Sequence, residues 1–186
     1  MRGATQRYRS RIVIGAIAPF MSKDTRVLDI GCGNGVVTRE IAAHFGCPVV
    51  GTDILAYGDH GMPFKRMRHP DVLDFGDGEF DAGLMIDVLH HVPFAQQAAL
   101  LREARRVCRT VFVFEVVPTA IAKAVDVLIN RVHHAGMPVP LTHRTREGWA
   151  RLFVAEGIPA RFYAVKKPSI FYPSTNYLCV LDGIPA

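Results

Sequence analysis

Apolar runs and amphipathic segments alternate along the first two thirds of the chain. Residues 25–30 form an apolar, β-branched run that ends at a cluster of glycines, which is typical of a buried parallel strand. Residues 36–45 then carry apolar positions at helical spacing and are followed by Gly46, a residue type that commonly ends helices. These two segments predict a strand followed directly by a helix.

The same alternation continues past the middle of the chain. Strands are predicted at residues 49–53, 80–87 and 111–116, with a weaker strand at 64–67, and a helix is predicted at residues 94–107. Parallel strands need long crossover connections, which are usually helical. The order therefore predicts an α/β fold in which a doubly wound, mostly parallel sheet has helices on both faces.

The two ends of the chain follow other patterns. Residues 12–21 are apolar at nearly every position and predict a short buried helix before the first strand. Near the C-terminus, residues 145–156 predict a further helix, and residues 161–166 and 176–181 predict two strands joined by a turn-rich segment. These two strands are expected to form an antiparallel hairpin, with the C-terminal strand as an antiparallel edge strand.

Composition excludes only a few classes of protein. Of the 186 residues, 49% are hydrophobic and 21% are charged, which fits one globular domain and excludes disorder and fibrous repeats. No apolar stretch is long and uninterrupted enough to predict a transmembrane helix. The four cysteines lie far apart with no CxxC pair, which argues against a zinc cage or a redox motif. A cytoplasmic location is expected.

The net charge of +5 permits an acidic partner. However, lysine and arginine are spread along the whole chain, with only small clusters at residues 2–11, 65–68 and 102–109. Proteins that bind nucleic acid usually concentrate their basic residues on one face or along one segment. Nucleic acid is therefore not the expected partner.

A glycine-rich segment, VLDIGCGNG at residues 27–35, joins the first strand to the first core helix. Glycines permit a tight turn there and let a ligand approach the backbone beside the helix N-terminus. Dinucleotide enzymes share such a turn, but their spacing is Gly-x-Gly-x-x-Gly, and Asp29 at the strand end would repel a pyrophosphate. S-adenosylmethionine has no phosphate and carries an ammonium and a sulfonium, so an acid at this position suits it.

Further acids follow the next strands. Asp53 ends the second strand, where a carboxylate can accept hydrogen bonds from both hydroxyls of an adenosine ribose. Asp71 is a candidate acceptor for the adenine amino group, with Val72 and Ile54 on the two faces of the ring. Two nearby aspartates compete with Asp71 for this role.

Four segments, in this order and spacing, resemble the class I methyltransferases that act on small molecules and use S-adenosylmethionine. They are VLDIGCGNG at residues 27–35, GTDI at 51–54, DVLDF at 71–75 and FDAGLMIDVLHHV at 80–92. The resemblance covers about residues 25–117 and implies a seven-stranded sheet whose last strand is antiparallel. It is much looser in the C-terminal third.

The resemblance implies one methyltransferase domain over residues 1–186. Its parts would be an N-terminal helix or lid (1–24), a cofactor-binding core (25–117), a variable substrate cover (118–144), and a C-terminal helix and hairpin (145–186). Tyr8 and Arg9 are candidates for a lid over the methionine end of the cofactor, with solvated surface as the alternative. The expected cofactor contacts are Asp29, Gly31, Cys32, Gly33, Asn34, Gly35, Asp53, Ile54, Asp71, Val72, Ile86 and Asp87.

Methyl transfer is an in-line displacement with a good leaving group, so positioning and exclusion of water lower much of the barrier without a base. For a hydroxyl or an acidic carbon a nearby base helps, and histidine is poised near neutral pH. His90 and His91 follow the fourth strand and are the candidate catalytic residues, with capping or packing as the alternative. Glu115 ends the fifth strand, at the edge where open α/β sheets bind ligands, and is a candidate substrate contact. No metal site is expected, because adjacent histidines such as His133 and His134 point apart on a helix.

We therefore expect methyl transfer to a hydroxyl, carbon or nitrogen of a small molecule. The apolar part of residues 118–144 favours an apolar acceptor or a partner face, although simple packing on the sheet explains it more economically. The segment after the fourth strand lacks the Asn/Asp-Pro-Pro-aromatic signature of amino-directed methyltransferases. Two alternatives stay open: a methyltransferase for RNA or protein, which salt-sensitive RNA binding would support, and a cofactor-binding module without turnover. No oligomeric state is predicted.

Overall fold

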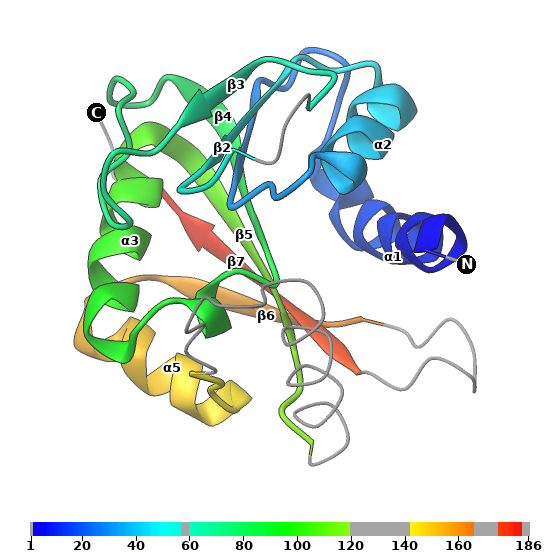
Figure 1. Cartoon of the computed structure of the whole chain (residues 1–186). Coiled ribbons are helices and arrows are strands. Elements are labelled where there is room, and N and C mark those ends of the chain that lie inside the picture. The colour runs from blue at the N-terminus through cyan, green and yellow to red at the C-terminus, as the bar shows by residue number, and fades with distance from the viewer. Residues whose placement is uncertain (1, 57–59, 120–141, 166–174, 184–186) are drawn as a thin grey trace.

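The computed structural model describes residues 2–56, 60–119, 142–165 and 175–183 (Figure 1). Seven strands form one sheet in the order β3-β2-β1-β4-β5-β7-β6. The strands are β1 Val27–Ile30, β2 Val49–Asp53, β3 Phe64–Arg66, β4 Phe80–Ile86, β5 Cys108–Val116, β6 Ala160–Ala164 and β7 Asn176–Asp182.

Strand direction in the sheet follows the expected α/β pattern. The pairings β2–β3, β1–β2, β1–β4 and β4–β5 are all parallel. The C-terminal strand β7 pairs antiparallel with both β5 and β6, which confirms the predicted antiparallel strand. Its predicted position at the edge is wrong: β7 lies between β5 and β6, because it pairs with both, and β6 is the edge strand. In the parallel part, Asp29 of β1 lies beside Gly51 of β2 and Leu84 of β4, which brings the carboxyl ends of the three strands together.

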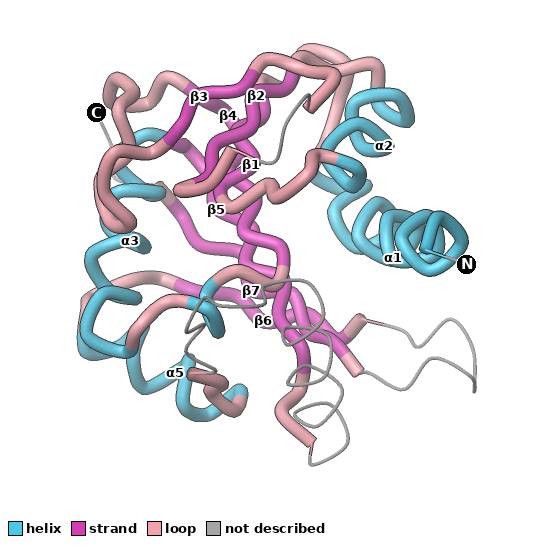
Figure 2. The backbone as a smooth tube through the Cα atoms, viewed as in Figure 1, coloured by secondary structure: helices cyan, strands magenta, loops and turns pink. Residues whose placement is uncertain are grey.

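Helices cover both faces of the sheet, as predicted (Figure 2). Helices α1 and α2 lie on one face, and α3 and α5 lie on the other. Their bounds are α1 Arg2–Ile17, α2 Val36–Phe45, α3 Phe94–Val107 and α5 Arg146–Ala155, with short 3₁₀ turns η1 at Ala18–Phe20 and η2 at Leu89–His91. None of the helices in the described part of the chain combines the length and hydropathy needed to cross a membrane.

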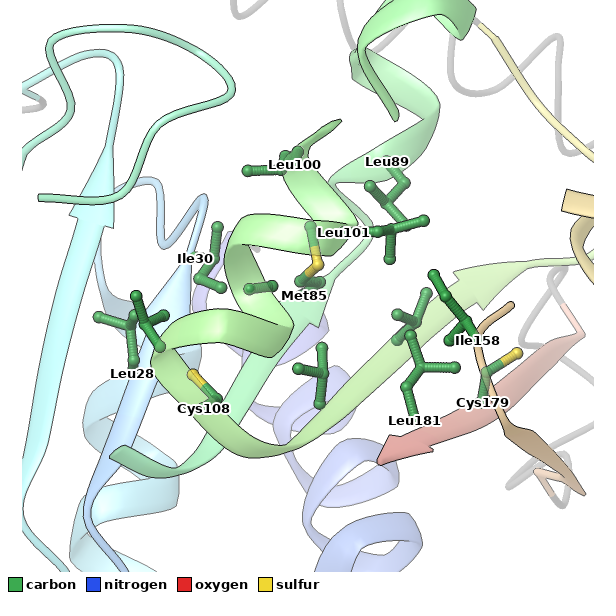
Figure 3. Close-up of a cluster of buried hydrophobic side chains, with 14 of the residues drawn as sticks. Leu28, Ile30, Met85, Leu89, Leu100, Leu101, Cys108, Ile158, Cys179 and Leu181 are labelled. Atoms are coloured by element: carbon green, nitrogen blue, oxygen red, sulfur yellow. The ribbon is translucent and has the colours of Figure 1, made fainter. Parts of the chain in front are cut away.

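Each helical layer has its own hydrophobic core. In Figure 3, Leu100 and Leu101 of α3 approach Met85 of β4 on one face of the sheet, and Trp149 of α5 belongs to the same cluster. On the opposite face Ile12, Val13 and Ile17 of α1 and Ile41 of α2 form a second cluster with side chains of the central strands, which include Leu84 of β4 and Phe112 of β5. Burial on both faces explains why the central strands are almost uninterrupted apolar runs.

Most element bounds agree with the pattern of apolar positions, and two do not. Helix α1 begins at Arg2 instead of residue 12, because its first turns are polar and carry no apolar periodicity. Strand β5 begins at Cys108, directly after α3, although Arg109 and Thr110 at its start are polar. In both places the element begins with polar residues, and the pattern of apolar positions therefore does not reveal its true start.

Candidate functional site

The glycine loop after β1 is shaped by left-handed backbone conformations. Gly31, Gly33 and Gly35 have φ values of 75°, 55° and 71°, which residues with a side chain rarely adopt. Gly31 N–H donates a hydrogen bond of 2.7 Å to the carbonyl of Thr52 in β2. A Cβ atom on Gly31 would also lie 2.6 Å from Cγ2 of Val88. The loop therefore needs glycine for its conformation and, at Gly31, for its packing.

The acid at the end of β2 is bonded to this loop. Asp53 Oδ2 accepts a hydrogen bond of 2.9 Å from the N–H of Gly33, and Oδ1 accepts one of 3.1 Å from the N–H of Leu55. The side chain is largely buried. Each carboxylate oxygen has a further lone pair. The glycines and Asp53, both predicted from the sequence as cofactor contacts, thus lie together. The carboxylate can still accept hydrogen bonds from a ligand.

Asp29, at the end of β1, is almost fully buried, with 3% of its surface exposed. The hydroxyl of Thr38 in α2 donates a hydrogen bond to its Oδ2. Burial raises the pKa of Asp29 to about 7, and the negative charge of Asp53 raises it further, while the Thr38 hydrogen bond and the charge of Arg9 lower it. A buried acid that ionises only with difficulty gains from a cation placed beside it.

Asp87 follows β4 and pairs with a residue near the N-terminus. Its φ is 52°, a positive value that no other described residue except glycine adopts. Oδ2 forms an ion pair with the guanidinium of Arg9 in α1, and the Asp87 N–H donates to the carbonyl of Phe114 at 2.8 Å. Arg9 also donates to the carbonyl of Ile86 at 3.4 Å. The ion pair ties α1 to the carboxyl end of β4, where the sequence predicts cofactor contacts.

The remaining predicted cofactor contacts lie around the same edge of the sheet. Ile54 follows β2 and Val72 follows β3, two paired strands, and their side chains are 44% and 49% exposed. Exposed aliphatic side chains of this size are available to an aromatic ring. Asp71 is half-buried, and no hydrogen bond or ion pair joins it to the glycine loop in the described part of the chain. Asn34 is exposed, and its Oδ1 accepts from the N–H of Val36 at 3.3 Å.

Cys32, the remaining loop residue, is half-buried, and its Sγ lies close to Gly51 of β2. Burial, together with the negative charges of Asp29 and Asp53, raises the pKa of its thiol. The thiol is therefore protonated at neutral pH and contributes to packing beneath the loop, not to nucleophilic chemistry.

A second group of polar residues surrounds the turn η2. His90 and Glu115 are 3% and 1% exposed, and Nδ1 of the ring lies 2.6 Å from Oε2 of the carboxylate. Glu115 Oε1 accepts a hydrogen bond of 2.8 Å from the N–H of Leu89. Burial raises the pKa of Glu115, and the charge and hydrogen bond of His90 oppose this shift. Glu115, the candidate substrate contact, is thus buried and hydrogen-bonded to the turn through Leu89 and His90.

The turn is held from two further elements. Thr142, at the end of the predicted cover, donates from its N–H and its hydroxyl to the carbonyl of His90, at 2.8 and 3.1 Å. Gln97 of α3 donates through Nε2 to the carbonyl of Leu89 at 2.9 Å and to Oγ1 of Thr142 at 3.0 Å. The ring of His143 stacks on that of His90, with centroids 4.8 Å apart. The following helix α3 and two segments distant in the sequence, at Glu115 and at Thr142, therefore fix one short turn.

The half-buried ring of His91 lies beside that of His90, with centroids 4.1 Å apart. Of the two predicted catalytic histidines, His91 is thus the more exposed. His133, His134 and most of the predicted cover lie outside the described residues.

The structure also brings together three potential metal ligands that were not predicted from the sequence. Asp87, His90 and Glu115 each have a ligand atom, and these atoms all lie within 4.8 Å of one another. The three residues come from the end of β4, from η2 and from β5, so no short spacing motif reveals them. Arg9 already pairs with Asp87, and Glu115 is hydrogen-bonded to His90, so both carboxylates of this group have a partner within the chain.

Comparison with known proteins identifies related sequences. A family model described as a methyltransferase domain matches residues 5–158. N-demethylindolmycin N-methyltransferase from Streptomyces griseus is 32% identical over 145 residues, which make up 68% of this chain and 60% of that protein. The match therefore spans less than two thirds of this relative's length.

Solved structures share the fold at low sequence identity. A SAM-dependent methyltransferase from Methanosarcina mazei has a TM-score of 0.67 and 18% identity, covering 92% of this chain and 98% of its own. The 1,6-didemethyltoxoflavin-N1-methyltransferase of Burkholderia thailandensis, solved with bound 1,6-didemethyltoxoflavin and S-adenosylhomocysteine, has a TM-score of 0.64 and 16% identity, covering 98% of this chain and 79% of its own. At these identities the likeness concerns the fold alone.

Proposed function

Because this chain belongs to the methyltransferase domain family, we propose that it transfers a methyl group from S-adenosylmethionine to a small-molecule acceptor. The observation that carries the proposal is the contact between Gly33 and Asp53 beside the buried acid Asp29. This arrangement offers a close backbone approach, an acceptor for ribose hydroxyls and an acid for a cation. Two similar proteins, from Streptomyces griseus and Burkholderia thailandensis, are by name N-methyltransferases of small molecules.

In this proposal the cofactor lies over the carboxyl ends of β1, β2 and β4. Asp53 accepts hydrogen bonds from the ribose hydroxyls, and Asp29 balances the positive charge of the methionine moiety. Ile54 and Val72 contact the two faces of the adenine, and Asp71 accepts from its amino group. The other contacts are Gly31, Cys32, Gly33, Asn34, Gly35, Ile86 and Asp87. We propose that residues 1–186 form one domain with the four parts that the sequence predicts.

The acceptor is expected beside η2, where the two histidines lie. When bound, S-adenosylmethionine supplies an activated methyl group whose leaving group is a neutral thioether. The chain's contribution is to hold the acceptor in line and to exclude water. Where the acceptor atom carries a proton, His90 or His91 receives it.

We propose that Glu115 acts through His90 and does not touch the acceptor. A hydrogen bond joins Oε2 of the carboxylate to Nδ1 of the ring, and the two atoms are 2.6 Å apart. This bond fixes the orientation of the imidazole and directs its other nitrogen, Nε2, away from Glu115. The hydrogen bonds of Gln97 and Thr142 to the same turn restrict its movement further.

The basic charge of the chain gives little support to an RNA or protein acceptor. Several arginines on the described surface are already paired with acids: Arg26 with Asp81, Arg102 with Glu156, Arg106 with Glu103 and Asp77, and Arg161 with Asp182. Charges neutralised within the chain contribute less to the attraction of a phosphate backbone. A small molecule is therefore the favoured acceptor.

Calorimetric titration with S-adenosylhomocysteine tests the cofactor site. We expect the wild type to bind it and the Asp53→Ala variant to lose most of the affinity. Asp24→Ala is the matched control, because Asp24 is an exposed aspartate just before β1. Absence of binding by folded wild type would overturn the proposal. Binding without methyl transfer to any acceptor in a screen with labelled cofactor would instead support a module without turnover.

A further inference from the structure

Arg144 is a half-buried arginine that pairs with no acid in the described part of the chain. It is the last residue of the predicted cover and lies just before α5. Burial lowers the pKa of its guanidinium, and the positive charge of Arg151 lowers it further. By contrast, the pKa values of Arg106 and Arg161 are raised, because each is hydrogen-bonded to an acid. Arg144 is thus a partly desolvated cation, and a bound anion would stabilise it.

Neutral groups hold the guanidinium of Arg144 in place. Its Nε donates a hydrogen bond of 2.6 Å to Oε1 of Gln97. The central carbon of the guanidinium lies 4.6 Å from the ring centroid of Phe94 and 5.6 Å from that of Trp149. These contacts fix the plane of the guanidinium. Both Nη groups have no partner among the described residues, and together they match the oxygens of a carboxylate or a phosphate.

The position of Arg144 relates it to the turn η2. Gln97, which accepts from Arg144, donates through Nε2 to the carbonyl of Leu89, the first residue of η2, at 2.9 Å. His143, the residue before Arg144, stacks on the ring of His90. A single side chain therefore separates the guanidinium from the turn beside which the acceptor is expected.

An apolar surface lies next to the guanidinium. Phe94 begins α3, and 51% of its surface is exposed. An exposed aromatic ring beside an uncompensated cation suits a ligand in which an anionic group is attached to an apolar one.

We propose that Arg144 selects acceptors that carry an oxyanion, either a carboxylate or a phosphate, attached to an apolar group. The Nη groups of Arg144 bind the oxyanion, and Phe94 contacts the apolar group. This inference rests on the proposed function, because it concerns the acceptor of the same methyl transfer. It makes Arg144 a specificity-determining residue that takes no part in proton transfer.

The test uses benzoate and phenyl phosphate as probes and benzamide as their uncharged control. Each is titrated into the protein with and without S-adenosylhomocysteine. Trp149 is the only tryptophan of the sequence and is 1% exposed, so its emission reports binding at the guanidinium that stacks on it. Saturation-transfer NMR of the probe protons gives a second measurement that does not depend on the tryptophan.

The variants are Arg144→Gln, Arg144→Lys and Arg151→Gln. Arg151 is the matched control, because it is an exposed arginine of α5 whose charge also acts at Arg144. We expect the wild type to bind one or both anions at least about tenfold more tightly than benzamide, the usual effect of charge-assisted hydrogen bonds. Arg144→Gln should lose this preference, and Arg144→Lys should keep part of it, because lysine retains the charge without the planar fork. Arg151→Gln should bind the anions within about twofold of the wild type.

A preference for benzoate or for phenyl phosphate identifies the oxyanion as a carboxylate or a phosphate. Equal binding of the anions and benzamide to the wild type, or no binding of any probe, would overturn the role of Arg144. An anion preference that persists in folded Arg144→Gln would do the same.

Circular dichroism and thermal melting show whether each variant folds. If Arg144→Gln does not fold, Arg144→Lys decides: weaker anion binding with unchanged benzamide binding supports the proposal, and unchanged anion binding overturns it. The proposed function fails by a separate result, which is the absence of S-adenosylhomocysteine binding by folded wild type.

Discussion

His90 Nδ1 and Glu115 Oε2 lie 2.6 Å apart, and both side chains are almost completely buried. A buried carboxylate is unfavourable unless it is hydrogen-bonded or paired, and this one accepts from a ring nitrogen and from the N–H of Leu89. The pair therefore joins β5 to the turn that carries both candidate catalytic histidines. We expect this pair to orient the imidazole ring of His90.

The Glu115→Gln variant tests this role. Glutamine keeps the shape and can still form hydrogen bonds, but it removes the negative charge that stabilises a positively charged imidazole. For an acceptor that carries a proton, we expect kcat to fall about 100-fold with little change in KM. The acid limb of the pH profile of kcat/KM should move to lower pH.

Steady-state kinetics with the acceptor found by screening measure both effects. Glu40→Gln, an exposed change on α2, is the control. Asp87, whose charge also acts on Glu115, is unchanged in both variants. A normal kcat and an unshifted pH profile in Glu115→Gln would contradict a positioning role.

Asp29 should make cofactor binding depend on pH. Its pKa of about 7 means that a substantial fraction is protonated at neutral pH. A cation bound beside it favours the ionised form, so binding must release a proton when the acid was protonated. Below pH 7 the dissociation constant of S-adenosylhomocysteine should rise, by up to about tenfold per pH unit.

Titration calorimetry in two buffers of different ionisation enthalpy measures this proton release at pH 6.5. Asp29→Asn should bind more weakly and release no proton, whereas Asp24→Asn should behave like the wild type. Equal proton release by Asp29→Asn and the wild type would show that another group is responsible.

The same acid should lower the stability of the unliganded fold at high pH. Its pKa rises from 3.8, the ordinary value of the side chain, to about 7 on folding. Between these values the folded state holds a proton that the unfolded state has lost, so the free energy of unfolding decreases as pH rises from about 4 to 7. The decrease is about 1.4 kcal/mol per unit of pKa shift.

Asp29→Asn has no such ionisation and should be more stable than the wild type at pH 8, with a smaller difference at pH 5. Urea unfolding at the two pH values gives the comparison. A stability difference that does not vary with pH would indicate that Asp29 is not protonated in the folded state.

Two glycines of the loop should respond differently to a methyl group. Gly31 and Gly33 both have positive φ, but only Gly31 has a neighbour, Val88, within 3 Å of the added Cβ; nothing lies within 4 Å at Gly33. Gly33→Ala should lose about 1 kcal/mol of stability from backbone strain. Gly31→Ala should lose at least about 1 kcal/mol more, because Val88 must move.

Urea unfolding of the two variants measures the difference, and each serves as the control for the other. We also expect Gly33→Ala to bind S-adenosylhomocysteine more weakly, because the methyl group enters the space into which the ligand approaches. Equal stability losses in the two variants would mean that Val88 adapts without cost.

Several parts of the fold were predictable because they depend on local sequence. The bounds of α2, β2 and α3 follow from apolar periodicity and from the glycines and prolines around them. The glycine loop and the acids at the ends of β1 and β2 were also recognisable, because parallel strands bring their carboxyl ends to one edge. The contact between Gly33 and Asp53 is the direct result.

Other features depend on side chains that meet only after folding. Arg9 lies in α1 and Asp87 directly follows β4, and no spacing between them indicates an ion pair. Glu115 stands at the expected edge of the sheet, yet packing of η2 over β5 buries it and gives it His90 as partner. Thr142 and Gln97, which hold that turn, carry no pattern that distinguishes them from ordinary polar residues.

The sequence by itself determined the class of fold, the glycine loop and the kind of ligand that the loop suits, because periodicity, glycine conformation and charge act over short distances. The tertiary structure alone decided the order of β5, β7 and β6, the pairing of Arg9 with Asp87 and the burial of Glu115. These features depend on which parts of the chain pack against one another and exclude water. Burial is therefore a property of the whole packed chain and not of any one segment.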